Sequence, residues 1–172
     1  MDNRLDWIYS RRSIRRYEEK DVDPQIIREL LEAAMAAPSA VGKDPWHFMV
    51  VKNRETLETI ADGLPNGTML ADAPLGVVVC GDIERAHSNL ESYMIQDCAA
   101  AIENLLLAAN ALSLGACWLG VHPRPERIAH IRSIFNLPEH IVPIAGIALG
   151  YPAEVKESRT RYNADAVHYE RW

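Results

Sequence analysis

A cluster of basic residues near the start of the chain is the first candidate for chemistry. Residues 11–16 read Arg-Arg-Ser-Ile-Arg-Arg, which places four guanidinium groups and one hydroxyl within six residues. A guanidinium group donates two parallel hydrogen bonds to a phosphate, and a hydroxyl or backbone N–H adds a further donor. The segment therefore predicts an anion site. The alternative is a solvated basic face whose charges pair with acidic residues elsewhere.

A second basic pair, Arg159 and Arg161, lies near the other end of the chain. Alternate residues on an extended segment point the same way, so both guanidinium groups could reach one anion. The two basic segments could also converge on a single phosphate. Their spacing in the sequence does not establish that they do.

Two further segments could border a flat ligand. Residues 37–46 form a loop of mostly small side chains closed by Trp46, and small side chains let an aromatic ring approach the backbone. Residues 116–121 form a predicted strand whose backbone N–H groups could meet a ligand, with Gly120 allowing a close approach. Each segment has a simpler interpretation, as a plain connection and a core strand respectively.

Other chemistries have little support in the sequence. The six histidines show neither an HExxH motif nor paired metal-ligand spacing, so no metal site is expected. There is no GxSxG motif and no GxGxxG after a strand, and Gly42-Lys43 is followed by Asp44, which rules out a Walker loop. A cysteine nucleophile stays open, although Cys98 on an alanine-rich helix indicates packing.

Hydrophobic periodicity and helix-capping residues predict the elements that position these segments. A short first helix is expected from about Asp2 to Arg11, with Leu5 and Ile8 facing inward. The longest helix should be the spine of the core, with Gly115 as its C′ residue. Helices without strict alternation with strands indicate an α+β fold. The remaining predicted helices are 24–37, 54–61, 88–114 and 125–135, and the predicted strands are 48–51, 75–80, 116–121 and 141–149.

Composition limits the class of protein. A length of 172 residues fits one domain, or two small ones that share a core. The net charge of −6 argues against a protein that mainly binds nucleic acid or anionic membrane. The three cysteines have no CxxC spacing, the N-terminus lacks a secretory signal, and no apolar stretch could span a bilayer, so a cytoplasmic protein is expected.

The last segment, residues 151–172, differs from the rest of the chain. It is polar and has no helical periodicity, yet it ends in His-Tyr-Glu-Arg-Trp. Large aromatic side chains at the tip of a tail favour a buried surface, which could be a second copy of the chain. The tail could equally pack on its own domain.

Taken in order, these segments resemble the nitroreductase family of flavoproteins. Residues 11–15 are similar to its RRSxR signature, and Pro38-Ser39-Ala40 followed by Pro45-Trp46 is similar to its second loop. Residues 97–118 resemble its D-x-x-A-A-x-x-N-L-L-L-A-A helix and the strand that follows. Arg159-Thr160-Arg161 and residues 168–172 are similar to its C-terminal signature, so the resemblance covers essentially the whole chain.

The resemblance implies a single domain, 1–172, with a mixed, mainly antiparallel central sheet flanked by helices. It also implies a homodimer in which the extension 151–172 wraps the partner subunit and two FMN sites lie at the interface. NADH or NADPH would reduce the flavin and leave, and a nitroaromatic, a quinone or a similar acceptor would then enter the same pocket. The chemistry would take place on the flavin, without a catalytic side chain.

The resemblance also carries roles over by position. Arg11, Ser13, Arg159 and Arg161 would hold the phosphate, with Arg12 nearby, and Arg15 would lie against the N1/O2 edge of the isoalloxazine ring. The other implied contacts are Pro38, Ser39 and Ala40 from the partner subunit, Asn66 at the edge of the ring, and Leu119 and Gly120 near N5.

This chain departs from the family pattern in the loop, where Gly42 and Asp44 replace two amide residues and add a carboxylate. It is also short for the family, so an open pocket is expected. Two rival hypotheses remain, a relative of the same fold with other flavin chemistry (dehalogenation or flavin fragmentation) and a flavin-binding module without turnover. A nucleic-acid binder is disfavoured by the net charge and by the absence of aromatic residues among the arginines.

Overall fold

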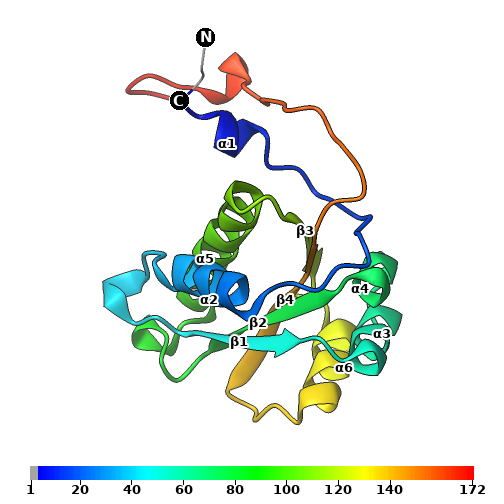
Figure 1. The fold of residues 1–172 in the computed structure, drawn as a ribbon. Coiled ribbons are helices and arrows are strands. Elements are labelled where there is room, and N and C mark those ends of the chain that lie inside the picture. The colour runs from blue at the N-terminus through cyan, green and yellow to red at the C-terminus, as the bar shows by residue number, and fades with distance from the viewer. Residues whose placement is uncertain (1–3) are drawn as a thin grey trace.

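A four-stranded sheet with the strand order β1-β2-β4-β3 forms the centre of the structure (Figure 1). The computed structural model describes residues 4–172. Every pair of neighbouring strands in the sheet is antiparallel, and β2 and β4 occupy its middle. The strands are Trp46–Val51 (β1), Leu75–Asp82 (β2), Gly115–Gly120 (β3) and Ile141–Gly150 (β4).

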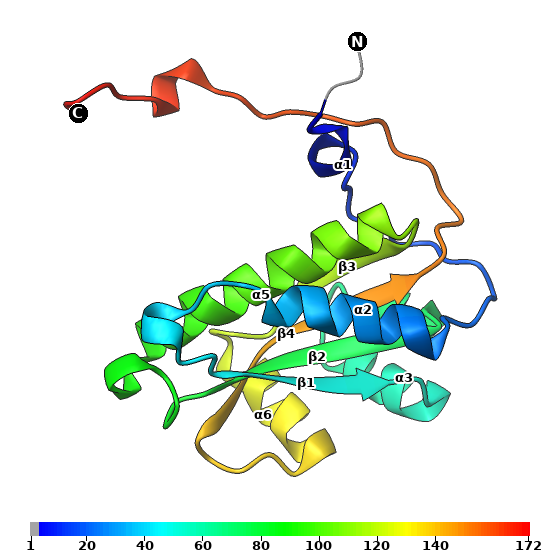
Figure 2. The same cartoon turned by 60° about the vertical axis from the view of Figure 1, so that its left-hand side comes forward.

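Helices cover both faces of this sheet, as Figures 1 and 2 show. Helices α2 and α5 pack on one face, whereas α3, α4 and α6 lie on the other. The α+β architecture with a mainly antiparallel sheet flanked by helices is therefore confirmed. The helices are Asp6–Tyr9 (α1), Pro24–Met35 (α2), Arg54–Asp62 (α3), Thr68–Asp72 (α4), Glu91–Ala111 (α5) and Pro125–Phe135 (α6), and short 3-10 turns occupy Ala40–Gly42, His87–Asn89 and Ala164–Ala166.

Burial explains why these segments form these elements. Strand β2 is buried along its whole length, which accounts for its continuous apolar run. Helix α5 is the predicted spine, since residues such as Met94, Ile102 and Leu105 are completely buried between α2 and the sheet. Helix α2 begins as its sequence predicts, because the Asp23 side chain accepts a hydrogen bond from the N–H of Gln25 (2.7 Å).

The prediction that Gly115 is the C′ residue of the longest helix was wrong. Helix α5 ends at Ala111, the left-handed conformation falls on Ser113 (φ 61°), and Gly115 is the first residue of β3. Glycine is required there for space, because a Cβ atom would lie 2.6 Å from Cγ2 of Ile14. The N–H of Ile14 donates to the carbonyl of Ala116 (3.0 Å), so the N-terminal basic segment, residues 11–16, passes closely beside β3.

The expected first helix is much shorter than predicted. Only Asp6–Tyr9 is helical, and Leu5 and Ile8 are exposed, so the expectation that they face inward is wrong for this chain by itself. The physical reason is position, because α1 lies beyond the core and is held by polar contacts from Asn110 Nδ2 to Trp7 O and Ser10 Oγ (both 2.8 Å). The predicted start at Asp2 lies outside the described residues.

The start of one helix and the presence of one short helix also differ from the prediction. Helix α5 begins at Glu91 and not at residue 88, because Ser88 takes a left-handed conformation (φ 54°) in the preceding turn. Helix α4, Thr68–Asp72, was not predicted, since five residues carry too little periodicity.

The C-terminal segment leaves β4, passes α1 and projects away from the sheet (Figure 2). The N–H of Arg159 donates to the carbonyl of Tyr9 (3.2 Å), whereas Tyr162 and Tyr169 are largely exposed and Trp172 is fully exposed. The first part of the tail therefore contacts its own domain, whereas the aromatic side chains near its tip do not pack there, and their packing on a second copy stays a prediction. Among residues 4–172, no helix is both long and apolar enough to cross a membrane.

Candidate functional site

The basic segments from the two ends of the chain meet in the structure. We define the arginine cluster as Arg11, Arg12, Arg159 and Arg161. Arg12 donates a hydrogen bond to the carbonyl of Glu157, and a shallow cavity of about 210 Å³ is lined by Ile8 and three of the four arginines. The pKa of Arg159 is lowered, chiefly by the positive charge of Arg161 and then by that of Arg12. The guanidinium groups are therefore close enough to repel one another.

Few carboxylates neutralise this cluster. Arg11 lies 3.7 Å from a carboxylate oxygen of Glu103, and within residues 4–172 the other three arginines form no ion pair. Most of the cluster is therefore not the ion-paired basic face that the sequence also allowed. Several like charges without counterions form a binding site for an anion, which would relieve their repulsion.

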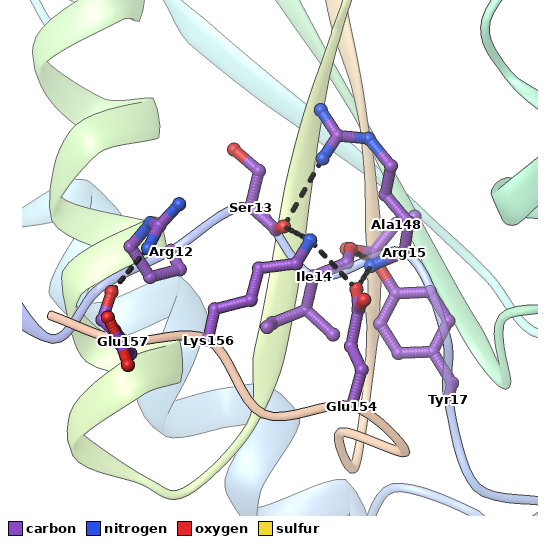
Figure 3. A network of polar contacts seen from close by, with 9 residues as sticks. All are labelled: Arg12, Ser13, Ile14, Arg15, Tyr17, Ala148, Glu154, Lys156 and Glu157. Atoms are coloured by element: carbon purple, nitrogen blue, oxygen red, sulfur yellow. Dashed lines mark hydrogen bonds and ion pairs between the residues drawn. The ribbon is translucent and has the colours of Figure 1, made fainter.

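Glu154 and Lys156, near the start of the C-terminal segment, form a strap that holds the basic segment 11–16 in place (Figure 3). Glu154 accepts a hydrogen bond from the N–H of Arg15 (2.6 Å), and Lys156 Nζ donates to the carbonyl of Ser13 (2.6 Å). Lys156 and Glu154 also form an ion pair with a separation of 3.0 Å. The backbone around Ser13 and Arg15 is thus fixed by residues about 140 positions away.

Four predicted site residues line a larger cavity of about 490 Å³: Arg15, Asn66, Leu119 and Gly120. The guanidinium group of Arg15 is oriented by a hydrogen bond from Nη1 to the carbonyl of Ser13 (3.3 Å). At Gly120 a Cβ atom would meet nothing within 4 Å, so the backbone there faces open space. The predicted site residues do not include the other lining residues, which are Leu64, Pro65, Thr68, Met69, Cys117, Trp118 and Arg127.

These additional lining residues differ in how far the sequence could have indicated them. Cys117 and Trp118 belong to a segment that the sequence had already marked as a possible ligand contact. Leu64 and Thr68 flank Asn66 in the chain, so their proximity follows from it. Arg127 lies in the first turn of α6 and carries no signal in the sequence, because only the packing of α6 brings it to the cavity.

Titratable groups near the cavity show no poised acid or base. Burial raises the pKa of the Cys117 thiol, so this group stays protonated at neutral pH. Burial likewise raises the pKa of Tyr17, whose hydroxyl donates to the carbonyl of Ile14 (2.6 Å) and so supports the turn beside Arg15. Within the described residues no group of three His, Cys, Asp or Glu side chains could hold a metal ion.

The predicted loop residues Pro38, Ser39 and Ala40 lie apart from this cavity. They line a separate, open pocket with residues of α5, among them Tyr93 and Asp97. A single chain therefore does not bring them to the residues around Gly120. This separation agrees with the expectation that they belong to a site in a partner subunit, but it does not test it.

Asp44, one of the two departures from the family pattern, closes its own loop. Ser39 Oγ donates to Asp44 Oδ1 (2.5 Å), and the N–H of Asp44 donates back to Ser39 Oγ (2.9 Å). The N–H of Ala40 donates to Asp97 Oδ1 (2.8 Å), which attaches the loop to α5. Gly42 suits its position because it has a positive φ of 64°.

Comparison with known proteins fits this geometry. A sequence model described as the nitroreductase family matches residues 8–65 and 60–151. This chain belongs to the nitroreductase family. A relative named "Putative NADH dehydrogenase/NAD(P)H nitroreductase" from Methanothermobacter thermautotrophicus is 45% identical over 168 residues, which cover 98% of this chain and 87% of the relative.

Solved structures of nitroreductase-family proteins have the same fold. A crystal structure from Parabacteroides distasonis, with the same name as the Methanothermobacter relative, has a TM-score of 0.92 and 40% identity, and the match covers 98% of both chains. The structure of a "putative nitroreductase in complex with FMN" from Desulfovibrio desulfuricans has a TM-score of 0.85 and 32% identity, covering 100% of this chain and 99% of that one.

The strap generates a testable prediction. Glu154→Ala removes the acceptor for the N–H of Arg15 and the partner of Lys156, so hydrogen exchange at the Arg15 amide should accelerate about tenfold. Exchange is measured by NMR or mass spectrometry at neutral pH. Glu157→Ala is the matched control, because Glu157 contributes only its backbone carbonyl to the contact with Arg12. Equal acceleration in both variants would show that the side chain of Glu154 holds nothing.

The same strap has a defined pH dependence. The N–H of Arg15 and then Lys156 lower the pKa of Glu154 below its ordinary value of 4.5. Because the pKa is depressed in the folded state, the contribution of this carboxylate to stability is present above pH 4.5 and is lost as the pH falls through the depressed value. Protection of the Arg15 amide should therefore be constant from about pH 7 to 5 and decline only at lower pH.

Proposed function

We propose that this protein is an FMN-dependent oxidoreductase that transfers electrons from NADH or NADPH to a nitroaromatic, a quinone or a similar acceptor. One observation carries the proposal. The arginine cluster, in which only Arg11 has a carboxylate partner among the described residues, and the 490 Å³ cavity are both reached by the segment that runs from Arg11 to Arg15. FMN requires such a pairing, a site for a dianion next to a site for a flat ring.

The arginine cluster fits the phosphate group. A phosphate dianion needs several donors at once, and guanidinium groups supply them in pairs. Arg11, Arg159 and Arg161 border the smaller cavity, and Arg12 lies within electrostatic reach of Arg159. In this proposal they bind the phosphate together with Ser13.

The larger cavity fits the isoalloxazine ring. Its volume of about 490 Å³ is in the usual range for sites of small molecules and cofactors. Gly120 presents backbone without a side chain to open space, so a ring can approach there, with Leu119 beside it. Asn66 supplies amide donors and an acceptor at the border of the same cavity. The presence of FMN in the Desulfovibrio relative supports this assignment.

Arg15 gives this site its electrostatic bias. Its backbone N–H is fixed by Glu154, and its side chain is held to the carbonyl of Ser13 at the border of the cavity. A fixed positive charge stabilises whichever state of a neighbouring group carries more negative charge. Arg15 would therefore favour the reduced cofactor and raise its potential.

FMN, when bound, supplies the redox chemistry by accepting hydride from a nicotinamide and passing electrons to a second molecule in the same place. The protein then has to bind and orient the two reactants against the flavin and to exclude water. This is a positioning task. The raised pKa of Cys117 fits this division of work.

A homodimer completes the proposed site. In a second copy, Pro38, Ser39 and Ala40 would reach the ring of the first, and residues 151–172 would wrap the partner. Apolar side chains that are exposed in the single chain, near the start of the chain and in the tail, support this arrangement: Trp7, Ile8, Val155, Tyr162, Tyr169 and Trp172. The three free and buried cysteines fit the reducing cytoplasm.

The decisive experiment is spectroscopic. The purified protein should be yellow, or should become so with added FMN, and NADH or NADPH should bleach the flavin absorbance under anaerobic conditions. A nitroaromatic or quinone acceptor should then restore the absorbance. A protein that binds FMN but is bleached by neither nicotinamide would be a binding module without turnover, and one that ignores FMN would contradict the proposal.

The arginine cluster makes a quantitative prediction. Replacing Arg159 and Arg161 together with alanine should weaken FMN binding about tenfold or more, because charge-assisted hydrogen bonds to the phosphate are lost. Fluorescence titration of the deflavinated protein with FMN measures the change. Arg28→Ala with Arg54→Ala is the matched control, since it removes the same charge far from the cluster. An unchanged affinity in the first variant would place the phosphate elsewhere.

The tail makes a prediction about assembly. Deleting residues 167–172 should raise the dissociation constant of the dimer about tenfold or more, because Tyr169 and Trp172 lose the surface they bury. Sedimentation velocity over a range of concentrations measures it. His168→Ala in the full-length chain is the milder control, as it removes only the ring that stacks on Trp172 at 4.2 Å. A dimer of unaltered affinity after the deletion would exclude the exchanged tail.

A further inference from the structure

The 490 Å³ cavity contains a second guanidinium group that the proposed FMN contacts do not account for. Arg15 comes from the N-terminal segment, whereas Arg127 comes from the first turn of α6. The phosphate is assigned to the smaller cavity, which Arg127 does not line. Arg127 therefore needs a different partner.

The side chain of Arg127 is held in place but has most of its donors left over. Its Nη1 donates to the carbonyl of Gly120 (2.8 Å), which anchors the guanidinium group beside the residue assigned to the ring. Its Nε is buried and has no hydrogen-bond partner. No carboxylate within residues 4–172 forms an ion pair with it. Since a guanidinium group carries five N–H donors, a ligand could still receive several of them.

The charge of the cavity points to an anionic ligand. Its lining contains two arginines and no Asp or Glu, and its other side chains are apolar or neutral. Two positive charges in a cavity with partly apolar walls concentrate anions and select against cations. A planar carboxylate matches the guanidinium fork, because it accepts two parallel hydrogen bonds.

We propose that Arg127 is a specificity-determining residue that binds a carboxylate group on the electron acceptor. The inference rests on the proposed function, because it assumes that the acceptor enters this cavity. Arg127 is attached to the carbonyl of Gly120, so an acceptor held by Arg127 lies next to the position assigned to the ring. The protein then prefers acceptors of the nitrobenzoate class over neutral molecules of the same shape.

The test compares two acceptors that differ mainly in charge, 4-nitrobenzoate and 4-nitrobenzamide, with the FMN-loaded, full-length protein. Wild type should have the higher kcat/KM for 4-nitrobenzoate. Arg127→Leu should lower that value about tenfold or more, chiefly through KM, because charged hydrogen bonds to the carboxylate are lost. The value for 4-nitrobenzamide should change less than about twofold. Arg127→Lys keeps the charge without the fork and should lie between the two.

Arg124→Leu is the matched control. Arg124 is the exposed residue that precedes α6 and does not line the cavity, so its loss removes the same charge from the same end of the helix. It should leave the preference for 4-nitrobenzoate unchanged. The flavin spectrum and content of each variant show whether the site is intact, and Arg127→Lys keeps the test available if Arg127→Leu loses FMN.

Equilibrium binding provides a readout that does not depend on turnover. Titration calorimetry of the oxidised, FMN-loaded protein should give tighter binding of benzoate than of benzamide, and Arg127→Leu should remove the difference. If Arg127→Leu lowers kcat/KM equally for both acceptors and weakens the binding of benzoate and benzamide equally, Arg127 only positions Gly120 and the inference is overturned. An unchanged preference also overturns it. If neither nicotinamide reduces the flavin, the proposed function fails, whereas the benzoate titration still decides the role of Arg127.

Discussion

Mutual repulsion among four guanidinium groups is the constraint on which the candidate site depends. Arg11 and Arg12 come from one end of the chain, and Arg159 and Arg161 from the other. Bringing them together is unfavourable without an anion, so other contacts must hold the two segments in place. The strap formed by Glu154 and Lys156 does this, because their hydrogen bonds attach the C-terminal segment directly to the backbone of the basic segment, and the ion pair between them holds the two side chains together.

The sheet and its spine helix make this arrangement possible. The basic segment lies against β3 through the bond from Ile14 to Ala116, and the C-terminal segment begins where β4, the neighbour of β3, ends. The two segments therefore lie beside adjacent strands although they are far apart in the sequence. Gly115 is essential to this contact, since any side chain there would collide with Ile14.

The two cavities divide the work of the proposed site. The smaller one is lined by three arginines and would take the phosphate, and the larger one is lined by Gly120, Asn66 and Arg15 and would take the flat ring. The loop of Ser39 lies in neither, and Asp44 turns its carboxylate inward to that loop. In the proposed dimer a second copy of the chain would bring this loop to the larger cavity, which agrees with the exposed apolar side chains of the tail.

The sequence by itself determined the residue types of the site and most of the core elements. Periodicity located α2, α5 and the four strands, because a long apolar pattern reflects burial that any tertiary arrangement must provide. The local hydrophobic pattern gave wrong predictions where burial depends on contacts with distant parts of the chain, or where an element is very short. Leu5 and Ile8 are apolar yet exposed, since α1 lies beyond the core and is attached to α5 by polar contacts, and the five residues of α4 are too few to show a period.

Only the tertiary structure decided which charges meet. Arg159 lies within electrostatic reach of Arg12, and Arg127 contacts Gly120. Both contacts depend on the packing of segments that are separate in the sequence. The spacing of residues in the sequence carries no information about the distances between these side chains. Those distances are set by the order of the strands in the sheet and by the packing of α6. The sequence thus specified the chemical groups, and the fold specified which of them lie close together.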